Sequence, residues 1–261
     1  MNVFGTPISI MNKFSKKLHN LKRRLGRKLV GSNPHDLAWL LCSGKGLEIG
    51  ARSNPYPFVG SVVQYADIGD DLVIRKIAEQ IDSTVKSQKY TFVDYILTGP
   101  KYGFEGISEQ IFDFVFSDNV LEHTPNPIYA LSEQFRILKP GGIIYCVLPN
   151  KKTTFDHKRS ATKLEVIVRK FTEDIFDHEI EEAMDVILNT EGHPAALWQV
   201  ADQLKLAEKM VASKDGGAHY FVFDESNTLS LIHYFLQLFP GYLEHFSSPQ
   251  GKNIHFAIRK M

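Results

Sequence analysis

The feature that most constrains the fold of this chain is an alternation, beginning at Gly46, of short apolar runs with segments of helical length. This pattern is typical of βαβ units, in which crossover helices join parallel strands. A helix is expected from an N-cap region at Asp224 to Ser226 through about Leu238. The strands are expected near residues 46–49, 61–66, 90–93, 112–117, 143–148, 242–246 and 253–259.

Two helical regions accompany the expected strands. Apolar residues recur at helical spacing from Asn126 to Leu138, which predicts a crossover helix, and the sequence Lys-Pro-Gly-Gly at 139–142 predicts a turn that ends it. Residues 160–213 are rich in Glu, Lys, Ala, Leu and Val. We expect them to form a helical cap inserted into the α/β pattern.

The length of 261 residues suits one α/β domain with additions. We predict an N-terminal arm at residues 1–35 and one domain at 36–261, with the cap insertion at 160–215. No run of about 18 apolar residues is present, which argues against an integral membrane protein. Two cysteines and no recognisable secretory signal favour a reducing, cytoplasmic location, and Cys146 lies in an apolar run typical of a core strand.

The arm has a charge pattern of its own. The chain has a net charge of zero, yet residues 1–35 contain lysines and arginines and no acidic residue. Leucines and a phenylalanine spaced three or four apart predict a basic amphipathic helix within residues 11–30. Three uses stay open: peripheral contact with an anionic membrane at the inner face, contact with a partner protein, or cover for the domain's own edge. No specific nucleic-acid binding is predicted.

Three segments coincide with the ends of expected strands: LEIG at 47–50, YAD at 65–67 and FDFVFSDNVLEH at 112–123, with ILKPGG following. Together they resemble class I S-adenosylmethionine-dependent methyltransferases, of the type 11-like group that includes members associated with surface-glycan biosynthesis. The resemblance covers about residues 44–150. It implies a Rossmann-like methyltransferase fold with a mostly parallel seven-stranded sheet and an antiparallel last strand, to which the cap and the basic helix are additions.

The resemblance also implies S-adenosylmethionine as the cofactor and indicates where it binds. Glu48 and Gly50 would shape the methionine pocket, Asp67 would hold the ribose hydroxyls, and Asp94 would contact adenine. A glycine lets the backbone approach a ligand, and a carboxylate can accept hydrogen bonds from two vicinal hydroxyls. The other expected cofactor-binding residues lie at the same strand ends: Ala51, Arg52, Ile68, Ser117 and Asp118.

Two sequence features test this resemblance. The absence of G-x-G-x-x-G disfavours a nicotinamide-binding sheet, because a pyrophosphate needs a glycine-lined helix N-terminus. Arg52 and Asn54 stand where the family often repeats glycine. They keep open the alternative of a non-catalytic or repurposed protein that serves as a binding or scaffold module.

Methyl transfer is mainly a matter of positioning, although a hydroxyl acceptor profits from a general base. We predict His123 and His157 as catalytic candidates. Each has a structural alternative, as does the Asp156 and Arg159 pair, which resembles a charged segment in glycan-associated methyltransferases. The expected substrate-binding residues are Asn150, Asp156, Arg159, His219 and Tyr220.

No metal site is predicted, because His178, His193, His219 and His233 lack close ligand spacing. The expected reaction is methylation of an oxygen of a sugar, glycan or glycan precursor. A lipid or another small metabolite stays open as the acceptor, because a fold does not name its substrate.

Overall fold

The computed structural model describes residues 34–52, 54–58, 60–70, 73, 91–97, 103–104, 106–213 and 217–261. The basic residues of the predicted arm and its helix within 11–30 lie outside these ranges, so their roles stay predictions. Among the described residues, no helix has both the length and the apolar character needed to cross a membrane.

Seven strands form one sheet in the order β3-β2-β1-β4-β5-β7-β6. Strands β1 to β5 pair in parallel, whereas β7 is antiparallel to both of its neighbours. This confirms the predicted Rossmann-like methyltransferase fold. The strands are β1 (Lys45–Ile49), β2 (Val62–Asp67), β3 (Tyr95–Ile96), β4 (Phe112–Asp118), β5 (Leu138–Leu148), β6 (Gly241–Ser247) and β7 (Ile254–Lys260).

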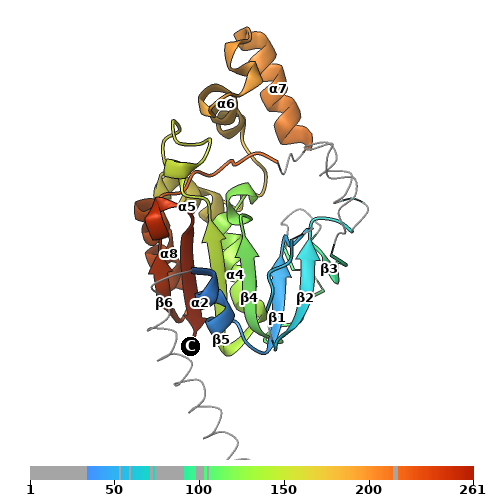
Figure 1. The fold of residues 1–261 in the computed structure, drawn as a ribbon. Helices are drawn as coiled ribbons and strands as arrows, with labels where there is room; N and C mark the ends of the chain where they lie inside the picture. Colours follow the sequence, from blue (N-terminus) through green and yellow to red (C-terminus); the bar gives the residue numbers. More distant parts are fainter. Residues whose placement is uncertain are drawn as a thin grey trace, which may run out of the picture.

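Helices cover both faces of the sheet (Figure 1). Helix α2 (Pro34–Leu41) packs on one face against alternate residues of β4 and β5, such as Phe116 and Tyr145. The intervening residues, including Cys146, point into the larger core on the other face. This period of two is the side-chain alternation of a strand buried on both faces. Helices α4 (Pro127–Ile137), α5 (Leu164–Thr172) and α8 (Glu225–Leu238) complete the second core.

The helices expected between residues 160 and 213 are present as α5, α6 (Ile180–Asn189) and α7 (Val200–Ser213). Helix α5 contacts α4 and α8 and therefore belongs to the layer beside the sheet. Helices α6 and α7 pack together beyond the carboxyl ends of the central strands (Figure 1). The boundaries of the cap as a separate insertion stay a prediction.

Two expected boundaries were wrong. The third strand lies at Tyr95–Ile96 and not at 90–93. Its position is set by pairing with the outer edge of β2, where Tyr95 pairs with Ala66 and Ile96 with Asp67. The Lys-Pro-Gly-Gly segment is not a turn between helix and strand but lies inside β5. Leu138 already pairs with Phe112, and after a register shift Ile143 pairs with Phe114, so strand pairing begins before the glycines.

The predicted start of α8 is confirmed in detail. Asp224 is the N-cap, and its side chain accepts a hydrogen bond from the backbone N–H of Asn227. The Asn227 side chain in turn accepts from the backbone N–H of Asp224, which completes a capping box. This rigid helix start follows directly after residues 217–223, a segment that reaches the candidate site.

Candidate active site at the carboxyl ends of the strands

The loops after β1, β2 and β4 meet at one edge of the sheet. Ile49 pairs with both Ala66 and Ser117, so the three strands end at the same level. The N–H of Gly50 donates to the Ala66 carbonyl oxygen at 2.9 Å. Gly50 has a φ of 73°, and a Cβ there would lie 2.7 Å from Val120 Cγ2. A glycine is therefore required where these loops come together.

One cavity at this edge surrounds the end of β1. Its lining includes Glu48, Gly50, Ala51, Arg52 and Asp118, all of which were expected at the cofactor site. Both Glu48 carboxylate oxygens accept from the N–H of Tyr56, at 2.9 and 3.2 Å. Burial raises the pKa of Glu48 to about 7 despite this bond.

Arg52 has a backbone conformation that is uncommon for residues other than glycine. Its φ of 48° lies in the left-handed region, and its carbonyl oxygen accepts from the N–H of Thr91 at 2.8 Å. The loop therefore makes its left-handed turn at Arg52, whereas Asn54 has no positive φ although asparagine adopts this conformation more readily. Arg52 and Gly50 also line a second cavity, so the two cavities adjoin at these residues.

The second cavity extends from the end of β2 to the loop after β4. Asp67, Ile68 and His123 line it, as do His178 of the α5–α6 connection and two residues that sequence reasoning missed, Leu97 and Phe104. The only signal for the missed pair was apolar character after the third strand. An Asp67 oxygen accepts from the N–H of Ile68 at 2.8 Å, and burial raises the pKa of Asp67. A small ligand with both polar and apolar parts fits such a lining.

Two expected cofactor residues are not brought to these cavities. Asp94 precedes β3 instead of following it, and its carboxylate accepts from the N–H of Tyr65 at 2.8 Å. Ser117 is buried, with its hydroxyl 3.2 Å from the Cys146 sulfur. Asp94 therefore ties two strands together, and Ser117 packs within the sheet core.

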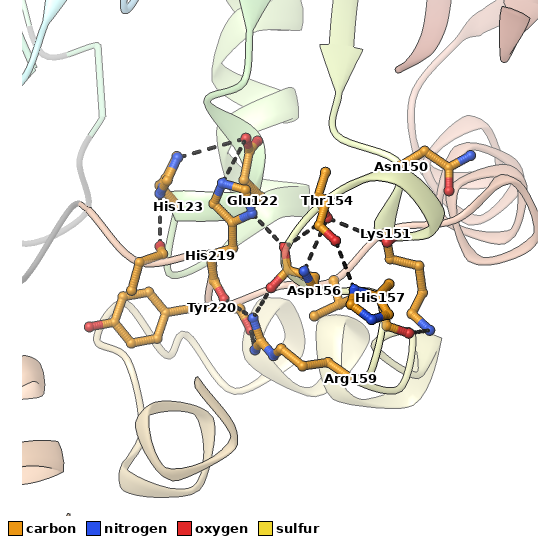
Figure 2. Close-up of polar contacts among 12 residues, drawn as sticks. Glu122, His123, Asn150, Lys151, Thr154, Asp156, His157, Arg159, His219 and Tyr220 are labelled. Atoms are coloured by element: carbon orange, nitrogen blue, oxygen red, sulfur yellow. Dashed lines mark hydrogen bonds and ion pairs between the residues drawn. The ribbon is translucent and has the colours of Figure 1, made fainter. Parts of the chain in front are cut away.

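Asp156 and Arg159 do not present free charges to a substrate, contrary to expectation. Arg159 is 1% exposed, and its guanidinium donates to Asp156 at 2.8 Å, to Asp185 at 2.8 Å and to the His219 carbonyl oxygen. Figure 2 shows the Arg159 guanidinium directed toward Asp156 and the backbone at His219 and Tyr220. The ion-pair alternative is therefore the one observed, and the pair holds the segment that contains His219 and Tyr220.

Three further expected residues serve structural contacts. Asn150 is fully buried and accepts from the N–H of Lys152 while donating to the Ser248 hydroxyl. His157 has a side chain 38% exposed, lies 3.5 Å from Glu191 and lines neither of the two cavities. The Tyr220 ring stacks on His178 with ring centroids 3.5 Å apart.

The most unusual group in this region is Glu122, the middle residue of the Leu-Glu-His segment, which sequence analysis did not single out. It is 0% exposed, and neither carboxylate oxygen has a hydrogen-bond partner among the described residues. Oε1 lies 3.7 Å from His123 Nε2 and 3.9 Å from His219 Nε2 (Figure 2). Burial raises the pKa of Glu122 to about 8 and lowers the pKa of His123 to about 4.

The prediction of no metal site was based on the spacing of histidines along the sequence. The structure brings together three side chains, Glu122, His123 and His219, that this spacing does not reveal. Each residue offers one ligand atom, and these atoms lie within 4.8 Å of one another. Spacing along the sequence could not show this, because His219 comes from a segment that folds back beside β4. Two N–H groups of that segment, at Tyr220 and Phe221, donate to the Glu122 carbonyl oxygen at 3.1 Å.

Comparison with known proteins places a methyltransferase domain family on residues 85–146, which span β3, β4 and most of β5. No curated protein matches. Among solved structures, the chain is similar to an S-adenosylmethionine-dependent methyltransferase from Aquifex aeolicus, with 11% identity, a TM-score of 0.44, and coverage of 93% of this chain and 98% of that one.

A structure of S-adenosylmethionine-dependent methyltransferases from Methanosarcina mazei has 15% identity and a TM-score of 0.45, with coverage of 88% of this chain and 98% of that one. For the citrinin polyketide synthase CMeT domain, the values are 11% identity, a TM-score of 0.40 and 84% of this chain, and this chain spans only 46% of that structure. The order of the seven strands and the domain match to residues 85–146 together support a class I methyltransferase whose cofactor is S-adenosylmethionine.

Proposed function

We propose that this protein transfers the methyl group of S-adenosylmethionine to a hydroxyl oxygen of a sugar, glycan or glycan precursor. The observation that carries the proposal is the lining of the second cavity, which runs from Gly50 and Asp67 to His123. The first two belong to strand ends where a cofactor of an open parallel sheet binds. His123 belongs to the polar cluster with Glu122 and His219.

In this arrangement the adenosyl group lies over the edge formed by β1 and β2. The backbone at Gly50 allows close approach, and the Asp67 carboxylate accepts hydrogen bonds from the ribose hydroxyls. Glu48 and Asp118 lie on the adjoining cavity, which suits the amino-acid end of the cofactor. Arg52, shared by both cavities, lies between the two ends of the cofactor.

The binding site for the methyl acceptor is inferred from the side chains beside His123. Methyl transfer needs the nucleophile in line with the sulfonium methyl, and a hydroxyl also needs help in losing its proton. The carboxylate and imidazoles of Glu122, His123 and His219 offer lone pairs in one place. Of the two histidines predicted as catalytic, only His123 lies there. The exposed ring of Phe155, 4.6 Å from the His219 ring, adds an apolar surface suited to a sugar face.

The cofactor part is tested by calorimetry with S-adenosylhomocysteine. Asp67→Ala should weaken binding at least about tenfold, because it removes charge-assisted hydrogen bonds. Asp94→Ala is the matched control, since that carboxylate accepts from the backbone of Tyr65 outside the cavities. Equal affinities for the two variants would show that the ribose is not held by Asp67.

The acceptor part is tested by incubating the protein and S-adenosylmethionine with separate pools of sugars and glycan precursors, lipids, and other small metabolites. Mass spectrometry then follows the gain of a methyl group. We expect products in the sugar or glycan pool only. Methylation confined to another pool would refute the acceptor class, and cofactor binding without transfer to any pool would favour the scaffold alternative.

A further inference from the structure

The starting point is the buried carboxylate of Glu122. A carboxylate removed from water is strongly disfavoured unless hydrogen-bond donors or a cation compensate it. Within the described residues, neither Glu122 oxygen has a hydrogen-bond partner, and the Nε2 atoms of His123 and His219 lie 3.7 and 3.9 Å from its Oε1. The carboxyl group of Glu122 is therefore buried beside two imidazole nitrogens, where a cation bound between the three side chains would compensate the carboxylate.

The two histidines are oriented so that the same nitrogen of each faces this carboxylate. His123 Nδ1 lies 2.8 Å from the Ala218 carbonyl oxygen, which can only accept, so Nδ1 carries the proton. His219 Nδ1 lies 2.6 Å from an Asp156 carboxylate oxygen and donates in the same way. The nitrogen of each ring that faces Glu122 is therefore Nε2, which offers a lone pair in the neutral form of the ring. Histidines that bind metals are held in this manner, with the other ring nitrogen on a carbonyl or a carboxylate.

We propose that Glu122, His123 and His219 form a binding site for a divalent transition metal ion, for which Zn²⁺ is the probe. Two histidines and one carboxylate are a common ligand set for a site that keeps one position open. Ligand atoms around a tetrahedral ion lie about 3.4 Å from one another. The separations of 3.7 and 3.9 Å from Glu122 Oε1 exceed this by only a few tenths of an ångström, and all three ligand atoms lie within 4.8 Å of one another, so a small approach of the side chains would close the site.

The surroundings hold the ligands and leave a route to solvent. Asp156, which orients His219, is itself fixed by Arg159 at 2.8 Å. The side chains of His123 and His219 are 21% and 12% exposed, whereas Glu122 is fully buried. The open position therefore faces the side of the histidines, and His123 is also one of the residues that line the second cavity.

The use of this ion rests on the proposed function. A divalent cation bound there would act as a Lewis acid, so an acceptor hydroxyl in the open position would release its proton more readily to water on the exposed side of the histidines, and its oxygen would then take the methyl group. The imidazole of His123 would then be a metal ligand. The ion, in place of His123 as a general base, would activate the acceptor hydroxyl. The metal site itself is defined by the three side chains and can be tested without any acceptor.

The test uses the full chain, freed of metal with a chelator and then titrated with Zn²⁺ against a competing chromophoric chelator. The wild type should bind one Zn²⁺ per chain, and Co²⁺ should give the visible absorption of a tetrahedral site. Glu122→Gln and His219→Ala should each weaken binding by more than about 100-fold, since each removes a direct ligand. His157→Ala is the matched control, because this histidine pairs with Glu191 outside the cluster.

Circular dichroism of the metal-free variants checks that each is folded, and Glu122→Gln keeps the shape of the side chain. No binding of Zn²⁺, Co²⁺ or Mn²⁺ by the wild type would overturn the proposal, as would equal binding by all four proteins. Calorimetry with S-adenosylhomocysteine on the same samples separates the two proposals. Cofactor binding without metal binding refutes only the metal site, and metal binding without cofactor binding refutes only the proposed function.

Discussion

Two buried glutamates lie near the same edge of the sheet, and their surroundings are built in different ways. Glu48 receives the N–H of Tyr56, a partner eight residues away in the loop that follows its own strand. Glu122 faces His123 and His219, and the latter comes from a segment almost one hundred residues further along the chain. The first environment is local, whereas the second exists only after the chain has folded back on itself.

The comparison shows that equal burial does not imply equal roles. Burial raises both pKa values, to about 7 for Glu48 and about 8 for Glu122. Glu48 nevertheless satisfies its oxygens with a backbone donor, which suits a residue that shapes a loop beside a ligand. Glu122 is left to face two imidazoles, and the segment that brings one of them depends on the buried pair of Asp156 and Arg159.

The largest expected effect tests how strongly that distant segment is held. Arg159→Ala should lower the free energy of unfolding by about 3–5 kcal/mol, because it removes the guanidinium from a buried ion pair and leaves the Asp156 carboxylate with His219 as its remaining charged neighbour. Urea denaturation measures this. Lys158→Ala is the control, since Lys158 pairs with Glu191 at the surface and should cost less than about 0.5 kcal/mol. Similar losses for both variants would show that the segment does not depend on the buried pair.

A smaller effect is expected from the titration of Glu48. Its pKa rises on folding from 4.5 to about 7, so the folded state binds more protons than the unfolded state between these values. The wild type therefore loses stability as pH rises through this window, and Glu48→Gln, which does not titrate, avoids that loss. The variant should gain up to about 3 kcal/mol relative to wild type between pH 4.5 and 7, and the difference should then level off.

Denaturation curves of both proteins from pH 4 to pH 8 give this difference directly. The amide that replaces the carboxyl group in Glu48→Gln retains an oxygen that can accept from Tyr56, so the loop contact is preserved. A difference that is constant with pH would mean that the pKa of Glu48 does not change on folding. The two glutamates would then differ in their titration as well as in their contacts.

The smallest expected effect concerns the tight contact between the loops after β1 and β4. Gly50 and Gly192 have φ values of 73° and 72°, so alanine at either position costs about 1–2 kcal/mol of backbone strain. Only at Gly50 would the new Cβ meet a neighbour, Val120 Cγ2 at 2.7 Å. Gly50→Ala should therefore cost about 1 kcal/mol more than Gly192→Ala in thermal or urea unfolding. Equal costs would show that the Val120 loop moves freely.

Much of the fold was predictable because it depends on local patterns. The apolar runs at β1, β4 and β5, the crossover helix and the Asp224 cap each arise from residues close in sequence. Errors occurred where pairing with a neighbouring strand set the boundary. The short edge strand β3 and the early start of β5 at Leu138 are both of this kind.

The candidate site divides along the same line. The strand ends that carry Gly50 and Asp67 were predictable, because parallel strands place their carboxyl ends at one edge. Asp94 was misplaced because its strand begins after it and not before it. The roles expected for Arg159 and His157 depended on which of them would be buried, and sequence position carries no such information.

By itself, the amino-acid sequence determined a parallel sheet and the edge where the candidate ligand-binding residues lie, since hydrophobic periodicity and strand direction follow from neighbouring residues. Only the tertiary structure decided that Glu122 would be buried with no hydrogen-bond partner in the part of the chain that the structure describes, and that His123 and His219 would face it. The physical reason is that this contact depends on how the chain from α5 to residue 221 returns to the sheet. That path is set by packing and by a buried ion pair among residues far apart in the sequence.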